Sequence, residues 1–277
     1  MSSCTVIAAT DLSARSAHVA GRGASLARGL GARLILAHVA SDEGGALPAR
    51  FGALGLGRAR DKPADLLTEI AQAHGAEPRL LQGAPDAALA GLAAQEGDVA
   101  LIVLGLHRER GALDLLRLTT MERIVLAAPC PVLVAHQPPD RDYAQVLAPT
   151  DFTAASAAAL IMAARIAPKA RFHAIHALQL PIGAIFKRGN TETEAALKRA
   201  ETLKAVFLAM PGLPPLAEPP EIVPGGVHQV LAFRREELAA DLVCIGAHSG
   251  RKPDSLGNYA RDLMRAPPTD LLVAKPG

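Results

Sequence analysis

The sequence contains few aromatic residues, and its positive and negative charges are nearly balanced. Aromatic residues make up 3% of the 277 residues, and tryptophan is absent. Proteins that bind single-stranded nucleic acid stack bases on aromatic rings, and DNA-binding domains usually carry a strong basic excess. Here 29 Lys and Arg are balanced by 27 Asp and Glu. We therefore expect no nucleic-acid partner.

Cysteines and long apolar runs are also scarce. Cys4, Cys130 and Cys244 are far apart and form no Cys-x-x-Cys pair, so neither a disulfide framework nor a zinc-ribbon spacing is present. No stretch approaches the ~18 uninterrupted apolar residues of a transmembrane helix. The N-terminus lacks a basic segment, and Asp11 interrupts its apolar run, unlike a secretory signal. We expect a cytoplasmic protein that does not bind membranes.

What the chain does contain is an internal repeat. The segment VIAATDLSARSA at Val6–Ala17 aligns without a gap with VLAPTDFTAASA at Val146–Ala157, which places Asp11 on Asp151. Three more pairs follow in the same order: Ala32–Val39 with Ala170–Ala177, Asp98–His107 with Asp241–His248, and Leu126–Ala135 with Arg265–Ala274. Four matched blocks in one order predict a duplicated domain.

Each half alternates short apolar strands with helices. The expected strands are Thr5–Ala9, Leu34–Val39, Arg79–Gln82, one ending at Gly105, Val132–Ala135, Gln145–Ala148, Phe172–Ala177, Glu221–Val223, one ending at Gly246, and Leu271–Ala274. The expected helices are Ala14–Leu30, Pro63–His74, Pro85–Gln95, Thr119–Ala127, Ala154–Ile166, Glu192–Met210, Val227–Leu238 and Asn258–Met264. Such alternation predicts an α/β fold with two tandem doubly wound, five-stranded parallel-sheet domains of Rossmann-like type. Their expected bounds are residues 1–137 and 143–277, on either side of a linker rich in proline and charge.

Ligands of such sheets bind at the carboxyl ends of the strands, where the strand order reverses. The first strand of each half ends in Thr10–Ser13 or Thr150–Thr153. The aspartate in this segment can accept hydrogen bonds from a ribose or a base amino group. It can equally cap the helix that follows. Both interpretations of Asp11 and Asp151 stay open.

A glycine-bearing loop follows the fourth strand of each half and leads into a helix, from Gly105 to Thr119 and from Gly246 to Asn258. Glycine lets a backbone approach a phosphate, and the free N–H groups of a helix start favour anions. Arg251 and Lys252 in the second loop either contact a phosphate or face solvent.

Two further kinds of site are less well supported. Asp11, His38 and His107, and their counterparts Asp151, His176 and His248, follow strand ends and carry zinc-ligating groups. Neither set shows the short ligand spacing of a zinc site, so no metal is predicted. No catalytic residue is predicted either, because Cys130 and Cys244 lie in or beside expected buried strands.

The sequence resembles the universal stress proteins of the UspA superfamily, in a tandem form that covers both halves. The resemblance lies in Ala128–Val134 (APCPVLV), in the aspartate after strand one, in His38-Val39 and in the Gly-x-His turns at Gly105 and Gly246. It implies an adenine nucleotide alpha hydrolase-like fold, a role in the stress response and at most weak ATP hydrolysis. Members that bind ATP carry a loop of the form Gly-x2-Gly-x9-Gly-[Ser/Thr], and others lack the loop and bind no nucleotide.

Each half departs from that loop. In the first half Arg108 and Leu118 stand where the family has its second and third glycines. In the second half the loop is shorter and has Ser249 beside Gly250. The resemblance therefore implies ATP or another adenine nucleotide in the second domain and a degenerate site in the first. The implied contacts are Thr150, Asp151, Thr153, Ala177, Gly246, His248, Ser249, Gly250, Gly257 and Asn258 in the second domain, and Asp11, Val39, Gly105, Arg108 and Thr119 in the first.

Two alternatives remain beside nucleotide binding. One is a nucleotide-free scaffold that acts through contacts with an unknown protein partner. The other, an ATP-using enzyme of the pyrophosphatase type, is disfavoured because the first turn lacks a glycine-rich pyrophosphate loop. The family also pairs the edges of its sheets, and the apolar strands Val132–Ala135 and Leu271–Ala274 would be hazardous if exposed. We therefore expect these fifth strands to pair the two halves as a pseudo-dimer within one chain, and the protein to form a homodimer.

Overall fold

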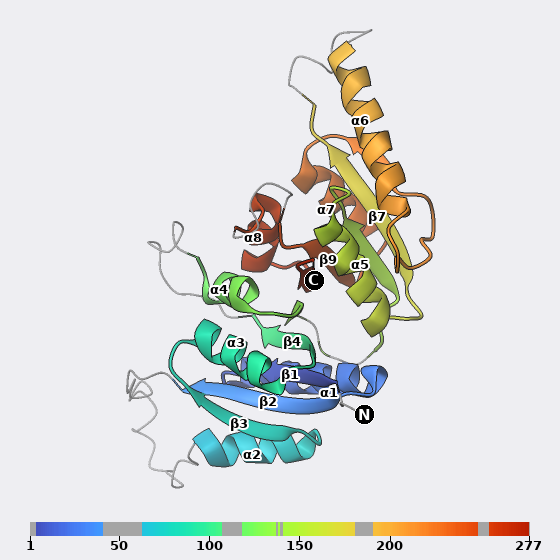
Figure 1. The fold of residues 1–277 in the computed structure, drawn as a ribbon. Coiled ribbons are helices and arrows are strands. Elements are labelled where there is room, and N and C mark those ends of the chain that lie inside the picture. The colour runs from blue at the N-terminus through green and yellow to red at the C-terminus, as the bar shows by residue number, and fades with distance from the viewer. Residues whose placement is uncertain are drawn as a thin grey trace. The chain divides into compact units, whose positions relative to one another are not determined.

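The computed structural model describes residues 4–40, 63–106, 118–136, 138, 141–180, 191–248 and 255–276. The contacts within the chain divide it into two compact units, Met1–Cys130 and Pro131–Gly277. Figure 1 shows the helices and strands of both units. Each unit is described by itself.

The first unit has a parallel sheet with the strand order β3-β2-β1-β4. Its strands are β1 (Thr5–Ala9), β2 (Arg33–Ala40), β3 (Glu77–Gln82) and β4 (Val99–Gly105). Its helices are α1 (Ala17–Leu30), α2 (Pro63–Ala73), α3 (Pro85–Glu96) and α4 (Thr120–Ala127). The central strands β1 and β4 are apolar runs because helices cover both faces of such a sheet. Ile7 and Ile102 in these strands have no exposed surface.

The second unit repeats this pattern with the order β10-β9-β6-β7-β8 and adds β5 beside β10. Its strands are β5 (Val132–Ala135), β6 (Gln145–Pro149), β7 (Arg171–Leu178), β8 (Glu221–Pro224), β9 (Leu242–Gly246) and β10 (Asp270–Ala274). Its helices are α5 (Ala154–Ile166), α6 (Thr191–Leu208), α7 (Val227–Glu237) and α8 (Asn258–Arg265). Among the described residues of this unit, the strands pair in parallel except β5 with β10, which are antiparallel with Leu133 opposite Leu272.

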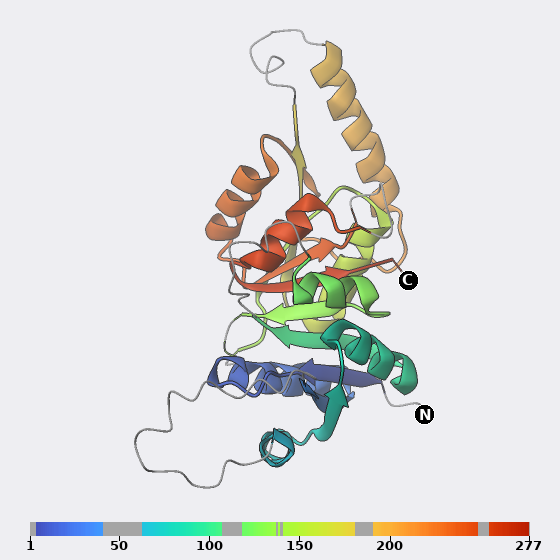
Figure 2. The same ribbon diagram turned by 90° about the vertical axis from the view of Figure 1, so that its left-hand side faces the viewer.

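The strand order of the second unit reverses between β6 and β9. From β6 the chain moves outward through β7 to β8, and it then returns to β9 on the other side of β6. Helix α6 lies on one side of the sheet and helices α7 and α8 lie on the other, as the views in Figure 1 and Figure 2 agree. Right-handed crossovers require this distribution. The carboxyl ends of β6 and β9 therefore leave room for a ligand between the helix layers.

A buried carboxylate fixes the chain between β5 and β6. Asp270 has no exposed surface, and its Oδ2 accepts a hydrogen bond from the Tyr143 hydroxyl at 2.6 Å. Its Oδ1 accepts a hydrogen bond from the backbone N–H of His136 at 2.8 Å. Both chain segments around the linker are thereby tied to β10. In the repeat alignment, the position of Asp270 is occupied by Pro131 in the first half, so this device occurs once.

The predicted α/β fold with its parallel sheets is confirmed. Strands Thr5–Ala9 and Val132–Ala135 and helix Ala154–Ile166 have the predicted bounds, and the remaining elements differ at their ends by a few residues. The one irregular start is that of α1, because a 3-10 turn at Ala14–Ser16 precedes the α-helix. Strand β5 pairs with β10, and the contacts within the chain therefore group it with the second unit. The domain bounds 1–137 and 143–277 stay a prediction. Among the described residues no helix is long and apolar enough to span a membrane.

Candidate functional site

The turn after strand one has the same unusual backbone in both units. Phe152 has φ 62° and Leu12 has φ 59°, a left-handed backbone conformation that residues other than glycine rarely adopt. In each case a threonine hydroxyl supports the turn: Oγ1 of Thr150 accepts from the N–H of Phe152 at 2.9 Å, and Oγ1 of Thr10 accepts from that of Leu12 at 3.0 Å. The Thr-Asp-x segment thus turns sharply and leaves the aspartate at the carboxyl end of the strand.

The carboxylate of Asp151 is held by one of its oxygens only. Its Oδ1 accepts hydrogen bonds from the N–H of Thr153 at 3.2 Å, from the hydroxyl of Thr153 at 2.6 Å and from the hydroxyl of Ser156 at 2.8 Å. Among the described residues Oδ2 has no hydrogen-bond partner, and Asp151 is half-buried. Its second oxygen is therefore placed to accept a hydrogen bond from a ligand.

Asp151 does not cap helix α5. The N-cap is Thr153, whose side chain accepts from the N–H of Ser156. Asp151 instead holds the cap residue in place through both the N–H and the hydroxyl of Thr153. In the first unit Asp11 is exposed, and its Oδ1 accepts from the N–H of Ser13 at 2.9 Å.

The strand-two histidines serve the same turn. Nδ1 of His176 lies 2.8 Å from the carbonyl oxygen of Thr150, and Nδ1 of His38 lies 2.9 Å from that of Thr10. A carbonyl oxygen only accepts, so Nδ1 carries the proton in both rings. The His176 ring also stacks on Phe152 at a centroid distance of 4.9 Å. Among the described residues no group of three or more His, Cys, Asp or Glu side chains is arranged to hold a metal ion.

The glycines that end the fourth strands are required by helix packing. A Cβ on Gly246 would lie 2.8 Å from the backbone carbon of Ala155, at the start of α5. A Cβ on Gly105 would lie 2.9 Å from the Cγ2 of Val19 in α1. Glycine here lets a helix approach the strand, a reason that is independent of any phosphate.

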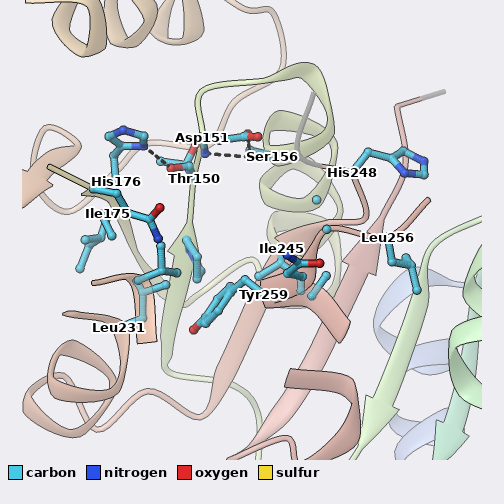
Figure 3. Close-up of a pocket in the computed structure, with 18 of the residues that line it drawn as sticks. Thr150, Asp151, Ser156, Ile175, His176, Leu231, Ile245, His248, Leu256 and Tyr259 are labelled. Carbon is cyan, nitrogen blue, oxygen red and sulfur yellow. Dashed lines mark hydrogen bonds between the residues drawn. The ribbon is translucent and has the colours of Figure 1, made fainter. Parts of the chain in front are cut away.

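A cavity of about 730 Å³ opens at the carboxyl ends of β6, β7 and β9 in the second unit (Figure 3). Seven of the predicted residues line it: Thr150, Asp151, Ala177, Gly246, His248, Gly257 and Asn258. Thr153 is not among the lining residues, because its side chain caps α5. Ser249 and Gly250 lie outside the described residues. Apolar side chains, among them Ile175, Leu231 and Ile245, form much of the remaining wall.

Sequence reasoning missed several lining residues: Ser156, Gln179, Val227, Leu231 and Tyr259. Of these residues, Ser156 could have been identified from the sequence repeat. Ser156 aligns with Ser16 in the repeat, and Ser16 also bonds to the strand-one turn, with its hydroxyl 2.8 Å from that of Thr10. Gln179 follows β7, and Val227, Leu231 and Tyr259 lie on helices whose inward faces cannot be read from a single sequence.

The start of helix α8 borders this cavity, and no side chain caps it. Its N-cap is Gly257, which provides no side-chain hydrogen bond, and its first three residues Asn258, Tyr259 and Ala260 all line the cavity. The first N–H groups of a helix have no partner within the helix and attract anions. The N–H of Gly257 itself donates to the carbonyl oxygen of Ala247 at 3.0 Å and is thus already used.

The corresponding helix start in the first unit is capped by side chains. Thr119 caps α4 through the N–H of Glu122, and the Glu122 carboxylate accepts in return from the N–H of Thr119. Glu122 has no exposed surface, and its carboxylate and the Thr119 hydroxyl already bond to backbone N–H groups at this helix start. Asp11 follows β1, Val39 lies in β2 and Gly105 ends β4, whereas Arg108 and His107 lie outside the described residues.

Comparison with known proteins identifies the family. The model of the universal stress protein family matches residues 4–136 and again residues 142–275. The chain belongs to the universal stress protein family. A search of curated protein sequences gives no match.

Solved universal stress proteins share the fold over nearly the whole chain. One from Archaeoglobus fulgidus is 19% identical, with a TM-score of 0.63 over 99% of this chain and 96% of that chain. One from Pseudomonas aeruginosa, described as putative, is 19% identical, with a TM-score of 0.59 over 98% of this chain and 93% of that chain. A universal stress protein from A. fulgidus in complex with dAMP is 25% identical but covers only 48% of this chain, with a TM-score of 0.31. That score is too low to carry its ligand over to this protein.

Proposed function

We propose that this universal stress protein is a regulatory module of the stress response that binds an adenine nucleotide in its second unit. ATP, ADP or AMP would occupy the cavity at the ends of β6 and β9, and the first unit would carry a degenerate site. The scarcity and spacing of the cysteines favour the cytoplasm as its compartment.

One observation carries the proposal: a free carboxylate oxygen and an open helix start border the same cavity. Oδ2 of Asp151 offers an acceptor to a ribose hydroxyl or a base amino group. The N–H groups of Asn258, Tyr259 and Ala260 offer donors to a phosphate. The apolar wall at Leu231 and Ile245 suits a heterocyclic base. An adenine nucleotide carries all three groups: hydroxyl or amino donors, an apolar ring and a phosphate.

The first unit differs from the second at the helix start where a phosphate would bind. Its α4 start carries the capping box of Thr119 and Glu122, so the backbone N–H groups of these two residues are not available to a phosphate. The Leu118 side chain also stands where the family has a glycine. Both features argue against a phosphate at this position.

Calorimetric titration of the purified protein with ATP, ADP and AMP tests the proposal. We expect a single site per chain for at least one of the three. Mass analysis of the denatured protein should also release a co-purified adenine nucleotide. A protein that releases none and gives no heat with any of them contradicts the proposal.

The second candidate is a nucleotide-free scaffold. It is favoured by the N–H of Gly257, which donates a hydrogen bond to the carbonyl oxygen of Ala247 and is therefore not available to a phosphate. If this alternative is correct, titration with ATP, ADP or AMP produces no heat of binding, and the protein acts through contacts with another protein.

A further inference from the structure

We propose that Tyr259 determines the specificity of the second-unit cavity, because its ring forms the wall against which the aromatic base of the ligand packs. This inference rests on the proposed function and names the part of the ligand that the site selects. A phosphate compound without a base would lack that contact.

The side chain of Tyr259 is placed by two helices. It is the second residue of α8, and in Figure 3 its ring extends beside Ile245, with its hydroxyl end directed toward the Leu231 side of the cavity. On α7 the ring of His228 meets it edge-on, with a centroid distance of 5.1 Å and an interplanar angle of 67°. Nε2 of His228 lies 3.3 Å from Oδ2 of Asp262, one turn further along α8. The ring therefore bridges the two helices that flank the cavity.

The hydroxyl of Tyr259 is less suited than the ring to recognise a ligand. Burial raises the pKa of this phenol, and the positive charge of Arg235 on α7 only partly opposes that rise. The phenol is thus neutral at physiological pH. Among the described residues the hydroxyl has no hydrogen-bond partner. What the cavity gains from this residue is a flat aromatic surface.

That surface fits the rest of the wall. Ile175, Leu231 and Ile245 are almost fully buried and apolar, and Tyr259 adds the only aromatic carbocycle among the lining residues that the structure describes. Polar groups that line the same cavity include the carboxylate of Asp151 and the backbone N–H groups at the start of α8. An aromatic heterocycle attached to a sugar and a phosphate can contact the ring, the carboxylate and the helix start together.

The test compares Tyr259→Phe, which keeps the ring, with Tyr259→Leu, which keeps apolar volume but removes it. We expect Tyr259→Phe to bind ATP within about twofold of the wild type, and Tyr259→Leu to bind it about tenfold to a hundredfold more weakly, the range for losing an aromatic contact with a base. The affinity for inorganic tripolyphosphate, measured by competition with ATP, should be the same in all three. Phe233→Leu is the matched control, because Phe233 is an exposed aromatic residue of α7 outside the cavity.

Tyrosine emission gives a second readout. The chain has two tyrosines and no tryptophan, and Tyr143 is buried against Asp270. ATP should change the tyrosine emission of the wild type, and this change should vanish in Tyr259→Phe although ATP still binds.

The outcomes separate this inference from the proposed function. A wild type that binds no nucleotide overturns both. A wild type that binds ATP, with Tyr259→Leu equally tight, overturns the inference alone. So does a Tyr259→Leu protein that loses ATP and tripolyphosphate in equal measure, because the ring would then only shape the start of α8. Tighter ATP binding by Tyr259→Leu would show that the ring obstructs the cavity.

Discussion

The hydroxyl of Ser156 donates a hydrogen bond of 2.8 Å to Oδ1 of Asp151. Together with two hydrogen bonds from Thr153, it saturates one carboxylate oxygen and leaves the other facing a cavity. An aspartate that only stabilised the turn would need one oxygen. The second oxygen borders the same cavity as the uncapped start of α8, and the two together make the second unit a candidate nucleotide site.

Gly257→Val tests the open helix start. Gly257 has φ −62° and ψ 146°, an extended backbone that any residue adopts, so valine adds bulk without backbone strain. The added methyl groups would fill the space that a phosphate needs at α8. We expect no measurable ATP binding by calorimetry and an unchanged circular dichroism spectrum.

Leu118→Gly in the first unit is the counterpart of that variant. It restores a family glycine, but the start of α4 stays closed by Thr119 and Glu122. ATP affinity and stoichiometry should equal those of the wild type. Gain of a second site per chain would refute our account of why the halves differ.

Tyr143→Phe should destabilise the protein. The change leaves Oδ2 of the buried Asp270 without the 2.6 Å hydrogen bond from this hydroxyl. We expect a loss of about 1–3 kcal/mol in the free energy of unfolding, measured by urea denaturation. Tyr259→Phe is the matched control, because its hydroxyl has no hydrogen bond to the described residues. Equal stability of the two variants would show that the Asp270 contact contributes nothing.

Cys244 should resist alkylation. Burial in strand β9 raises the pKa of this thiol far above its usual value, so the reactive thiolate is scarce at pH 8. Cys4 and Cys130 are half-buried. Mass spectrometry after iodoacetamide treatment of the native protein should find Cys244 modified at least about tenfold more slowly than either of the others. Equal rates in the native protein would mean that β9 opens readily.

The fold could be predicted from the sequence because its signals are local and occur twice. The apolar runs at Thr5–Ala9 and Val132–Ala135 and the alanine-rich stretch at Ala154–Ile166 gave exact bounds. The 3-10 turn before α1 was missed, since nothing in Ala14–Ser16 distinguishes it from the start of an α-helix. The pairing of His136 and Tyr143 with Asp270 was also beyond reach, because it joins positions that are distant in the sequence.

The candidate site was predictable where it follows strand ends and not where it faces inward from helices. Asp151, Gly246 and Gly257 carry recognisable residue types at fixed places in the topology. Leu231 and Tyr259 have no such mark, because their place at the cavity depends on how α7 and α8 pack against the sheet. The predicted alternative of a helix cap fell on the wrong residue: Thr153 caps α5, and Asp151 holds Thr153.

The most direct test of nucleotide binding in the second unit is the ATP affinity of Asp151→Asn measured beside that of Asp11→Asn. Asparagine keeps an oxygen for Thr153 and Ser156 but replaces the free carboxylate oxygen with an amide that donates. We expect Asp151→Asn to lose about 1–3 kcal/mol of binding free energy with its melting temperature unchanged, and Asp11→Asn to bind as the wild type does. Full ATP affinity in Asp151→Asn, or an equal loss in Asp11→Asn, would contradict the assignment of the site.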